Sequence, residues 1–467
     1  MSETLEEKRK RLKALLSGEG MPTKKVPSAV SSDSSTRRPA EIVDYADYSY
    51  DMFMNSMGEA PIEAERFSEW VKAASKDKVY AFESARLHGQ RTEIEIERED
   101  GERLQMLNFS SYNYLGFGYH PRVIQAAKDA LDTYGLGAAS SPVISGTFDL
   151  HKRLEQRLAQ AYSGMAEKVA ASLFSSGYGV NIGVVSAIIK PGNYVVLDQD
   201  AHMSLLDGAR LSGGKIRYFR HNDPEHLRQV LEEIRNGQSR ILVCIEGVYS
   251  AGGEFGKVAE IGKVAKEYGA QLLVDEAHSA LLVGPEGLGV AADQDALELV
   301  DYLVLTFSKA FGGVGGAVIA REELACYLNW YARSRFFSCA IDPAVTAGVL
   351  EVLDLAISEE GERRRKRLHE NAAHLRAQLR DHVTLCNSQS WVVPVLFGSE
   401  TLTLRLNDFL QRQGLDTSIM AFPATPKNEA RIRMFVTSEH TLEQCTRAAE
   451  IVIEAAQQFG FARKGTR

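Results

Sequence analysis

The segment Leu303-Val304-Leu305-Thr306-Phe307-Ser308-Lys309-Ala310-Phe311-Gly312-Gly313 joins an apolar run to a lysine and a pair of glycines. The apolar run predicts a buried strand, and the glycines predict a tight loop directly after it. A lysine held at such a junction suits an amine that forms a Schiff base with an aldehyde. For a lysine considered alone, a solvated surface position is the alternative interpretation.

A second segment supports the chemical interpretation. The run Leu272-Leu273-Val274-Asp275-Glu276-Ala277-His278 predicts another buried strand that leads into a carboxylate and an imidazole. An enzyme that uses pyridoxal 5'-phosphate (PLP) needs a lysine for the aldehyde carbon, an acid for the pyridinium nitrogen and a polar neighbour for the ring oxygen. The two segments together predict a PLP site built on Lys309 and Asp275, because Asp275 would keep the pyridinium nitrogen protonated.

The composition is that of an ordinary globular protein and argues against some classes of partner. Of 467 residues, 44% are hydrophobic and 25% are charged, and the formal net charge is -8. This mild negative charge argues against non-specific binding of nucleic acid. No apolar run approaches the roughly 18 residues that span a membrane. The length suggests more than one domain.

The termini and cysteines lead to an expectation about the compartment. Charged residues begin at position 3, so we expect no secretory signal. The five cysteines are scattered and lack the spacing of metal ligands, so we expect reduced thiols, no metal site and a cytoplasmic protein.

The chain divides into four parts by composition and pattern. Residues 1–45 form an extension with a short charged helix and a flexible linker, which suits docking to a partner protein; a disordered solubilising tail is the alternative. Residues 46–107 form an N-terminal segment. We expect a large domain over 108–345 and a smaller C-terminal α+β domain over 346–467.

The large domain alternates apolar runs with helix-like segments such as 257–268. Continuous apolar runs predict strands that are buried on both faces, and hence a mainly parallel sheet between helices. Such α/β sheets bind ligands at the carboxyl ends of their strands. The expected strands are 194–198, 241–246, 272–275 and 302–305, and in the C-terminal part 390–397 and 431–436 follow a long charged helix over 358–382.

Other polar residues follow these strands and suit the same cofactor. The turn at Gly177 and Tyr178 opens a helix, whose N-terminal N–H groups could hold a phosphate, although a plain turn uses the same residues. His202 lies just past a strand and could stack on a pyridine ring; a surface histidine is the alternative. The remaining candidates for cofactor binding are Glu246 at a strand end, Ser250 in a turn, and Thr306 and Ser308 beside the lysine.

At this point the sequence resembles a known family. The order EGVYS, DEAHS and TFSKAFGG, with SYNYLGF at 111–117 and SGTFDLHKRLE at 145–155, is similar to the α-oxoamine synthases, and the resemblance covers roughly residues 60–455. It implies a fold-type I PLP-dependent transferase that condenses a small amino acid (glycine, alanine or serine) with an acyl thioester. The product would be an α-amino ketone, formed with release of CO₂ in a biosynthetic pathway such as that of a secondary metabolite or lipid.

The resemblance implies catalytic roles for four residues. Lys309 would carry the cofactor and later remove the Cα proton of the amino acid. Asp275 would be the pyridinium partner, and His278 would hydrogen-bond the ring oxygen. His202 would stack on the ring and touch the substrate carboxylate.

The resemblance also implies binding roles. Gly177, Tyr178 and Thr306 match the phosphate site, and Arg433 matches a carboxylate-binding arginine, for which a fork of donors is suited. Asn113, in the SYNYLGF motif, is the second candidate for substrate binding. Ser338 lies in a segment that the family uses across its dimer interface, so the resemblance implies a homodimer with sites at that interface.

The sequence departs from the family in three places. It has Ala138-Ala139-Ser140-Ser141-Pro142 where many members carry a Gly-Ser run, and Met420-Ala421-Phe422-Pro423 where several place an arginine before two prolines. The N-terminal extension resembles docking segments of biosynthetic assembly lines. The acyl donor could therefore be acyl-CoA or an acyl carrier protein.

Two other functions remain open from the sequence. A PLP-dependent aminotransferase or lyase on the same fold would keep Lys309 and Asp275 but would not need to bind a thioester. A non-catalytic partner subunit is the second alternative. The presence of Lys309, Asp275, His278 and His202 argues against it, because clustered polar residues of this kind are typical of functional sites.

Overall fold

The computed structural model describes residues 60–76, 80, 82–98, 101–235, 237–422 and 424–463. All of these belong to one unit, residues 45–467. The helix and linker expected in residues 1–45 lie outside the described residues, and so does Pro423.

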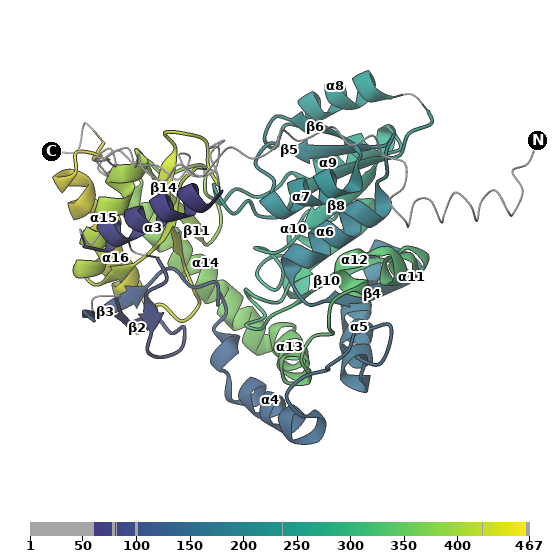
Figure 1. The fold of residues 1–467 in the computed structure, drawn as a ribbon, viewed down its shortest axis with the longest axis horizontal. Coiled ribbons are helices and arrows are strands. Elements are labelled where there is room, and N and C mark those ends of the chain that lie inside the picture. Colours follow the sequence, from purple (N-terminus) through teal and green to yellow (C-terminus); the bar gives the residue numbers. More distant parts are fainter. Residues whose placement is uncertain are drawn as a thin grey trace, which may run out of the picture. The chain divides into compact units, whose positions relative to one another are not determined.

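The largest sheet of the described residues has seven strands, several of which are labelled among the surrounding helices in Figure 1. Its order is β4-β10-β9-β8-β7-β5-β6, and β10 alone among the seven runs against the others. The sheet is therefore mainly parallel, as the apolar runs predict. The bounds are β4 (Val169–Phe174), β5 (Tyr194–Asp198), β6 (Lys215–Phe219), β7 (Ile241–Glu246), β8 (Gln271–Asp275), β9 (Tyr302–Thr306) and β10 (Gly316–Arg321).

Helices cover both faces of this sheet, which explains why its strands are apolar throughout. In β7, Leu242 and Cys244 pack with α6 (Gly177–Ile188) and α7 (Met203–Ser212). The alternate residues Val243 and Ile245 pack with a second cluster. Successive side chains of a strand point to opposite faces, so a strand between two helical layers needs an unbroken apolar run. The helices of the second cluster include α5 (Asp149–Ala161), α8 (Pro224–Ile234) and α9 (Val258–Glu267).

The C-terminal part has its own sheet and contributes to a second one. Strands β11 (Val392–Gly398), β14 (Ala430–Phe435) and β13 (Ser418–Met420) form a three-stranded sheet. The other sheet has the order β1-β2-β3-β12, so the N-terminal segment pairs with β12 from the C-terminal part. The bounds are β1 (Ala85–Arg86), β2 (Glu93–Glu97), β3 (Arg103–Asn108) and β12 (Leu415–Asp416).

The remaining helices connect these sheets. The expected boundary near residue 345 falls within α13, and the division into domains stays a prediction. The α-helices are α3 (Ala60–Lys76), α4 (Pro121–Tyr134), α10 (Val290–Asp293), α11 (Glu322–Tyr331), α12 (Arg333–Phe336), α13 (Pro343–Ala356), α14 (Glu359–Leu379), α15 (Glu400–Arg412) and α16 (Leu442–Gln458). Short 3-10 turns lie at Phe117–Tyr119, Ser163–Met165, Pro285–Gly287 and Leu297–Leu299. No described helix is both long enough and apolar enough to cross a bilayer.

A buried carboxylate organises the loop after β8. Glu276 is fully buried and accepts hydrogen bonds from the backbone N–H groups of Val290 (3.0 Å) and Ala291 (2.8 Å), and from the hydroxyl of Ser279. Gly289 closes this loop with φ +98°, and a Cβ there would lie 2.6 Å from Glu276 Oε2. The buried carboxylate of Glu276 thus fixes the loop that follows β8, the strand that ends in Asp275.

We expect Glu276→Ala to lower the free energy of unfolding by about 3 kcal/mol, because it leaves two buried N–H groups without an acceptor. Urea unfolding followed by circular dichroism measures this, with the exposed Glu298→Ala as the control. A loss as small as that of the control would show that Glu276 does not stabilise the loop.

Candidate active site

The candidate residues meet where neighbouring strands end. Strands β5, β7, β8 and β9 end in Asp198, Glu246, Asp275 and Thr306, and parallel strands present these ends at one edge of the sheet. A cavity of about 1130 Å³ opens there. It is lined by Gly177, Tyr178, His202, Glu246, Ser250, Asp275, His278, Thr306, Ser308, Lys309 and Arg433.

Lys309 lies in the tight turn after β9. The N–H of Gly312 donates to the carbonyl of Lys309 (2.8 Å), and the N–H of Gly313 donates to that of Phe307 (2.8 Å). Burial of the amine lowers the pKa of Lys309 to about 8, although Asp275 and Glu246 act in the opposite direction. A larger share of this amine is therefore neutral near physiological pH than of an exposed lysine.

Asp275 is a buried carboxylate held by two donors. The side-chain amide of Asn181 donates to Oδ2 (2.6 Å), and the N–H of Ala277 donates to Oδ1 (3.0 Å). The amide of Asn181 also donates to the hydroxyl oxygen of Ser204 (2.9 Å), which lies 2.7 Å from Nδ1 of His202. A continuous chain of hydrogen bonds thus links Asp275 to His202.

His278 is held on several sides. Its Nδ1 lies 2.8 Å from the hydroxyl of Tyr114, and its carbonyl accepts a hydrogen bond from Nε1 of Trp391 (3.0 Å). The rings of Tyr112 and Phe435 also contact it. Burial, with the nearby charges of Lys309 and Arg433, lowers the pKa of His278 well below its usual value, so the ring is neutral.

Glu246 lines the cavity and joins two loops. It accepts hydrogen bonds from the N–H of His202 (2.7 Å) and from the N–H of Ser250 (3.3 Å). Burial, followed by the neighbouring charge of Asp275, raises the pKa of Glu246 to about 8.

Arg433 reaches the cavity from β14 and uses two of its five N–H donors on neighbouring residues. Its Nη1 donates to the carbonyl of Ser250 (3.0 Å), and its Nη2 donates to the hydroxyl of Ser418 (3.1 Å). Its Nε is buried and has no partner among the described residues. A carboxylate is the natural acceptor for an unused guanidinium donor.

The N-terminus of α6 forms one wall of the cavity. The hydroxyl of Ser176 caps this helix by accepting from the N–H of Gly179 (2.9 Å), and the first N–H groups of a helix have no partner within it. A Cβ at Gly177 would lie 2.5 Å from Oγ1 of Thr306, so only glycine lets the helix approach this hydroxyl. Thr306 in turn lies 2.9 Å from the hydroxyl of Ser308.

Asn113 lines a different cavity, of about 600 Å³. Lys309, Ser308 and Tyr112 line both cavities, so the lysine lies in the wall between them. The second cavity also includes Arg86, which donates to Asp416 (2.6 Å).

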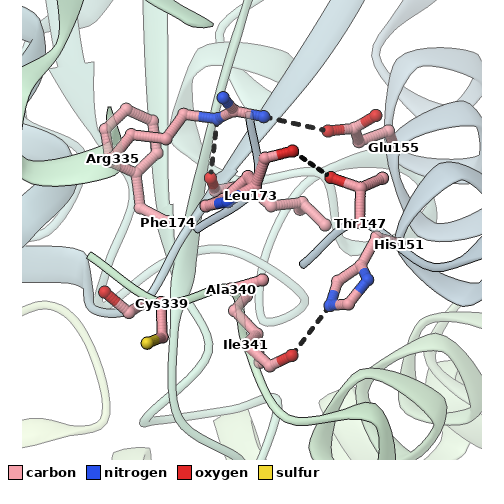
Figure 2. Close-up of a pocket in the computed structure, with 11 residues that line it drawn as sticks. Thr147, His151, Glu155, Leu173, Phe174, Arg335, Cys339, Ala340 and Ile341 are labelled. Atoms are coloured by element: carbon pink, nitrogen blue, oxygen red, sulfur yellow. Dashed lines mark hydrogen bonds and ion pairs between the residues drawn. The ribbon is translucent and has the colours of Figure 1, made fainter. Parts of the chain in front are cut away.

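Ser338 is not among the residues that line either of these cavities. Ser338 lies in a segment whose neighbouring residues contact β4 and α5, as Figure 2 shows. Arg335 donates to the carbonyl of Leu173 (3.1 Å) and lies 3.9 Å from Glu155, and His151 contacts the carbonyl of Ile341 at 2.7 Å. Within a single chain, Ser338 therefore does not join the site of Lys309.

Among the buried polar residues of the site that were not predicted are Tyr114, Asn181 and Ser204. Each lies in a segment that the sequence already marks, but its own role depends on a partner elsewhere in the chain. Asn181 offered one signal, because it interrupts an otherwise apolar helix face.

The residues present fit PLP. The donor set offers an amine at Lys309, a buried carboxylate at Asp275 and a helix N-terminus with the hydroxyl of Thr306. These match an aldehyde, a pyridinium nitrogen and a phosphate. The glycine at 177 keeps the approach to the phosphate position open, since a Cβ would fill it.

Known proteins are similar to this chain in sequence. The model of the aminotransferase class I and II family matches residues 105–452. A serine palmitoyltransferase from Sphingobacterium spiritivorum is 33% identical over 398 residues, which are 85% of this chain and 97% of that protein. An 8-amino-7-oxononanoate synthase from Thermoanaerobacter pseudethanolicus is 32% identical and covers 87% of this chain and 99% of that protein.

A solved structure agrees with the sequence comparisons. The serine palmitoyltransferase of S. paucimobilis, solved with PLP and myriocin bound, has a TM-score of 0.80 at 29% identity and covers 86% of this chain and 100% of that one. The chain belongs to the aminotransferase class I and II family, and within it to the α-oxoamine synthases. The expected family and fold are thus confirmed.

The lowered pKa of Lys309 predicts when its amine reacts. In cofactor-free protein, labelling of Lys309 by an amine-reactive reagent should rise with a midpoint near pH 8, against about 10.4 for an ordinary lysine. Peptide mass spectrometry over a pH series measures this, and the exposed lysines in the same digest are the control. A midpoint equal to theirs would contradict the burial of this amine.

Proposed function

We propose that this protein is a PLP-dependent acyltransferase that condenses a small amino acid with an acyl thioester and releases CO₂. The observation that carries the proposal is a lysine amine of lowered pKa in a cavity that also holds a buried aspartate and an unused arginine donor. Relatives named serine palmitoyltransferase and 8-amino-7-oxononanoate synthase support the reaction class. The product is an α-amino ketone, made for biosynthesis.

Each candidate residue has a part in holding the cofactor. Lys309 would bind the aldehyde carbon, Asp275 would pair with the pyridinium nitrogen, and His278 would donate to the ring oxygen. The phosphate would be held by Gly177, Tyr178, Thr306 and Ser308, and Glu246 and Ser250 would line the site. When bound, PLP accepts the electron pair that the substrate's Cα releases.

The protein's own groups then act on the substrate. Arg433 and His202 bind the carboxylate of the amino acid and so orient its Cα–H bond. The amine of Lys309 removes the Cα proton, which its lowered pKa permits near neutral pH. The Cα carbon forms a bond to the thioester carbonyl carbon, the C–S bond breaks and the thiolate leaves. The resulting β-keto acid loses CO₂, and the electron pair left on Cα takes up a proton to give the α-amino ketone.

The second cavity supports a separate approach for the acyl donor. Asn113 lines it together with Lys309, so a thioester placed there would lie beside the amine that releases the Cα carbon to react. The donor is acyl-CoA or an acyl carrier protein, as the N-terminal extension suggests.

We expect purified enzyme with PLP to release free thiol and CO₂ when a small amino acid and an acyl-CoA are both present. Lys309→Ala should lower this rate by at least about 10³-fold, because it removes the nucleophile and base. A thiol-reactive dye and a CO₂ assay measure the two products in parallel. Amino-group exchange with a keto acid, without thiol release, would instead identify an aminotransferase.

We also propose that the protein is a homodimer. Leu136, Ile144, Val314 and Phe337 are each at least 60% exposed, which is unusual for large apolar side chains in such number. The N–H of Ala340 donates to the carbonyl of Ser140 (3.0 Å), so the loops of Ile144 and Phe337 are tied together. A partner subunit that covers these loops could bring its Ser338 to the site.

We expect Phe337→Asp to shift the enzyme from dimer to monomer, because it places a charge in an apolar interface. Sedimentation velocity measures the change, and Leu211→Asp, at an exposed apolar residue on α7, is the control. A wild-type protein that sediments as a monomer would contradict the proposal.

The cysteines support a reducing compartment. Cys244, Cys326, Cys339, Cys386 and Cys445 are all free. We therefore place the enzyme in the cytoplasm, where thiols remain reduced.

A further inference from the structure

We propose that Tyr114 is a positioning residue that holds His278 in a single tautomer, with the proton on Nε2, so that this ring is a fixed hydrogen-bond donor to the cavity. The inference rests on the proposed function for the identity of the acceptor, the ring oxygen of PLP. The tautomer itself belongs to the protein alone.

The hydroxyl proton of Tyr114 has one hydrogen-bond acceptor among the described residues. Tyr114 is fully buried, and its hydroxyl has Nδ1 of His278 at 2.8 Å as its hydrogen-bond partner among the described residues. If Nδ1 carried the proton, the tyrosine proton would be buried without an acceptor, which is costly. The tyrosine therefore donates to a bare Nδ1, and burial keeps it protonated by raising its pKa well above the usual value.

Because His278 is neutral, the position of its one ring proton follows from the state of Nδ1. A neutral imidazole carries one proton, so a bare Nδ1 places that proton on Nε2. His278 remains neutral because burial and the charges of Lys309 and Arg433 lower its pKa. The contacts of Tyr112 and Phe435 and the bond from Trp391 hold the rest of the residue, so the donor has a fixed direction.

His202 reaches the same tautomer by a different route. The carboxylate of Asp275 requires a donor from Asn181, which fixes the orientation of that amide. The same NH₂ group donates to the oxygen of Ser204, so the hydroxyl proton of Ser204 is directed to Nδ1 of His202. The N–H of Ser204 also points at this nitrogen (3.3 Å). The cavity is therefore lined by two neutral imidazoles that both donate through Nε2.

This arrangement explains why Tyr114 is a tyrosine and not a phenylalanine. Its ring fills a core position between Trp391 and Phe435, which phenylalanine would fill equally well. The hydroxyl adds only the bond to His278. Without the hydroxyl, both tautomers of His278 become accessible. The tautomer with a bare Nε2 would place a lone pair against an anionic oxygen in the cavity.

The test compares Tyr114→Phe with the wild type by ¹⁵N NMR of histidine side chains in the full chain, with and without PLP. In the wild type, His278 and His202 should both carry the proton on Nε2. In Tyr114→Phe, His278 alone should become a mixture, while His202 serves as the internal reference. Signals are assigned with His278→Gln and His202→Gln.

Activity and spectra provide a second readout on the holoenzyme. In Tyr114→Phe the pH midpoint of the cofactor's visible absorption change should move to higher pH, since the ring oxygen loses a donor. The kcat should fall about three- to tenfold, with a smaller change in the KM of the amino acid. Tyr162→Phe is the matched control, because Tyr162 is equally buried but its hydroxyl has no partner among the described residues.

Each outcome decides the proposal. A wild-type His278 protonated on Nδ1, or a tautomer unchanged in Tyr114→Phe, would overturn it. Should Tyr114→Phe not fold, the wild-type spectrum alone decides. Failure of the proposed function appears separately, as an absence of thiol and CO₂ release by wild-type enzyme whatever the tautomer.

Discussion

The buried carboxylate of Asp275 is the constraint on which the rest of the site depends. A buried charge is costly unless it is hydrogen-bonded and paired with a cation. Asn181 and the N–H of Ala277 supply donors, and Lys309 lies close enough for Asp275 to act against the lowering of its pKa. The helix α6, the loop after β8 and the turn after β9 must therefore meet at one place. Glu276, buried in that loop, keeps the second of them in position.

Burial also disfavours the charged forms of several titratable groups in the site. Burial lowers the pKa of His202 and His278, so both rings are neutral donors, and the pKa values of Glu246 and Lys309 both lie near 8. Arg433 stands apart as the charged group with an unused donor. An anionic substrate meets neutral imidazole donors and the guanidinium of Arg433, which suits the binding of a carboxylate.

The sequence predicted four of the seven strands of the largest sheet, because the physical cause of a buried apolar run is local. The run Ile241–Glu246 is wholly apolar until its last residue, and it forms β7 with those bounds. The same reasoning did not predict that β10 runs antiparallel, or that β3 of the N-terminal segment pairs with β12, because strand pairing depends on distant partners. Asn113 and Ser338 show the same limit. Asn113 lines a second cavity, and Ser338 lies outside both cavities within one chain.

The sequence alone determined the family, the cofactor chemistry and many of the residues that line the main cavity. That chemistry requires a lysine, an aspartate and a glycine at the ends of strands, and the sequence shows these residue types directly after its apolar runs. Only the tertiary structure decided which hydrogen bonds orient those residues. Tyr114 and His278 are 164 positions apart, and Asn181 and Asp275 are 94 apart. No local pattern records such pairs, since burial and the need to satisfy each polar group bring them together only in the folded chain.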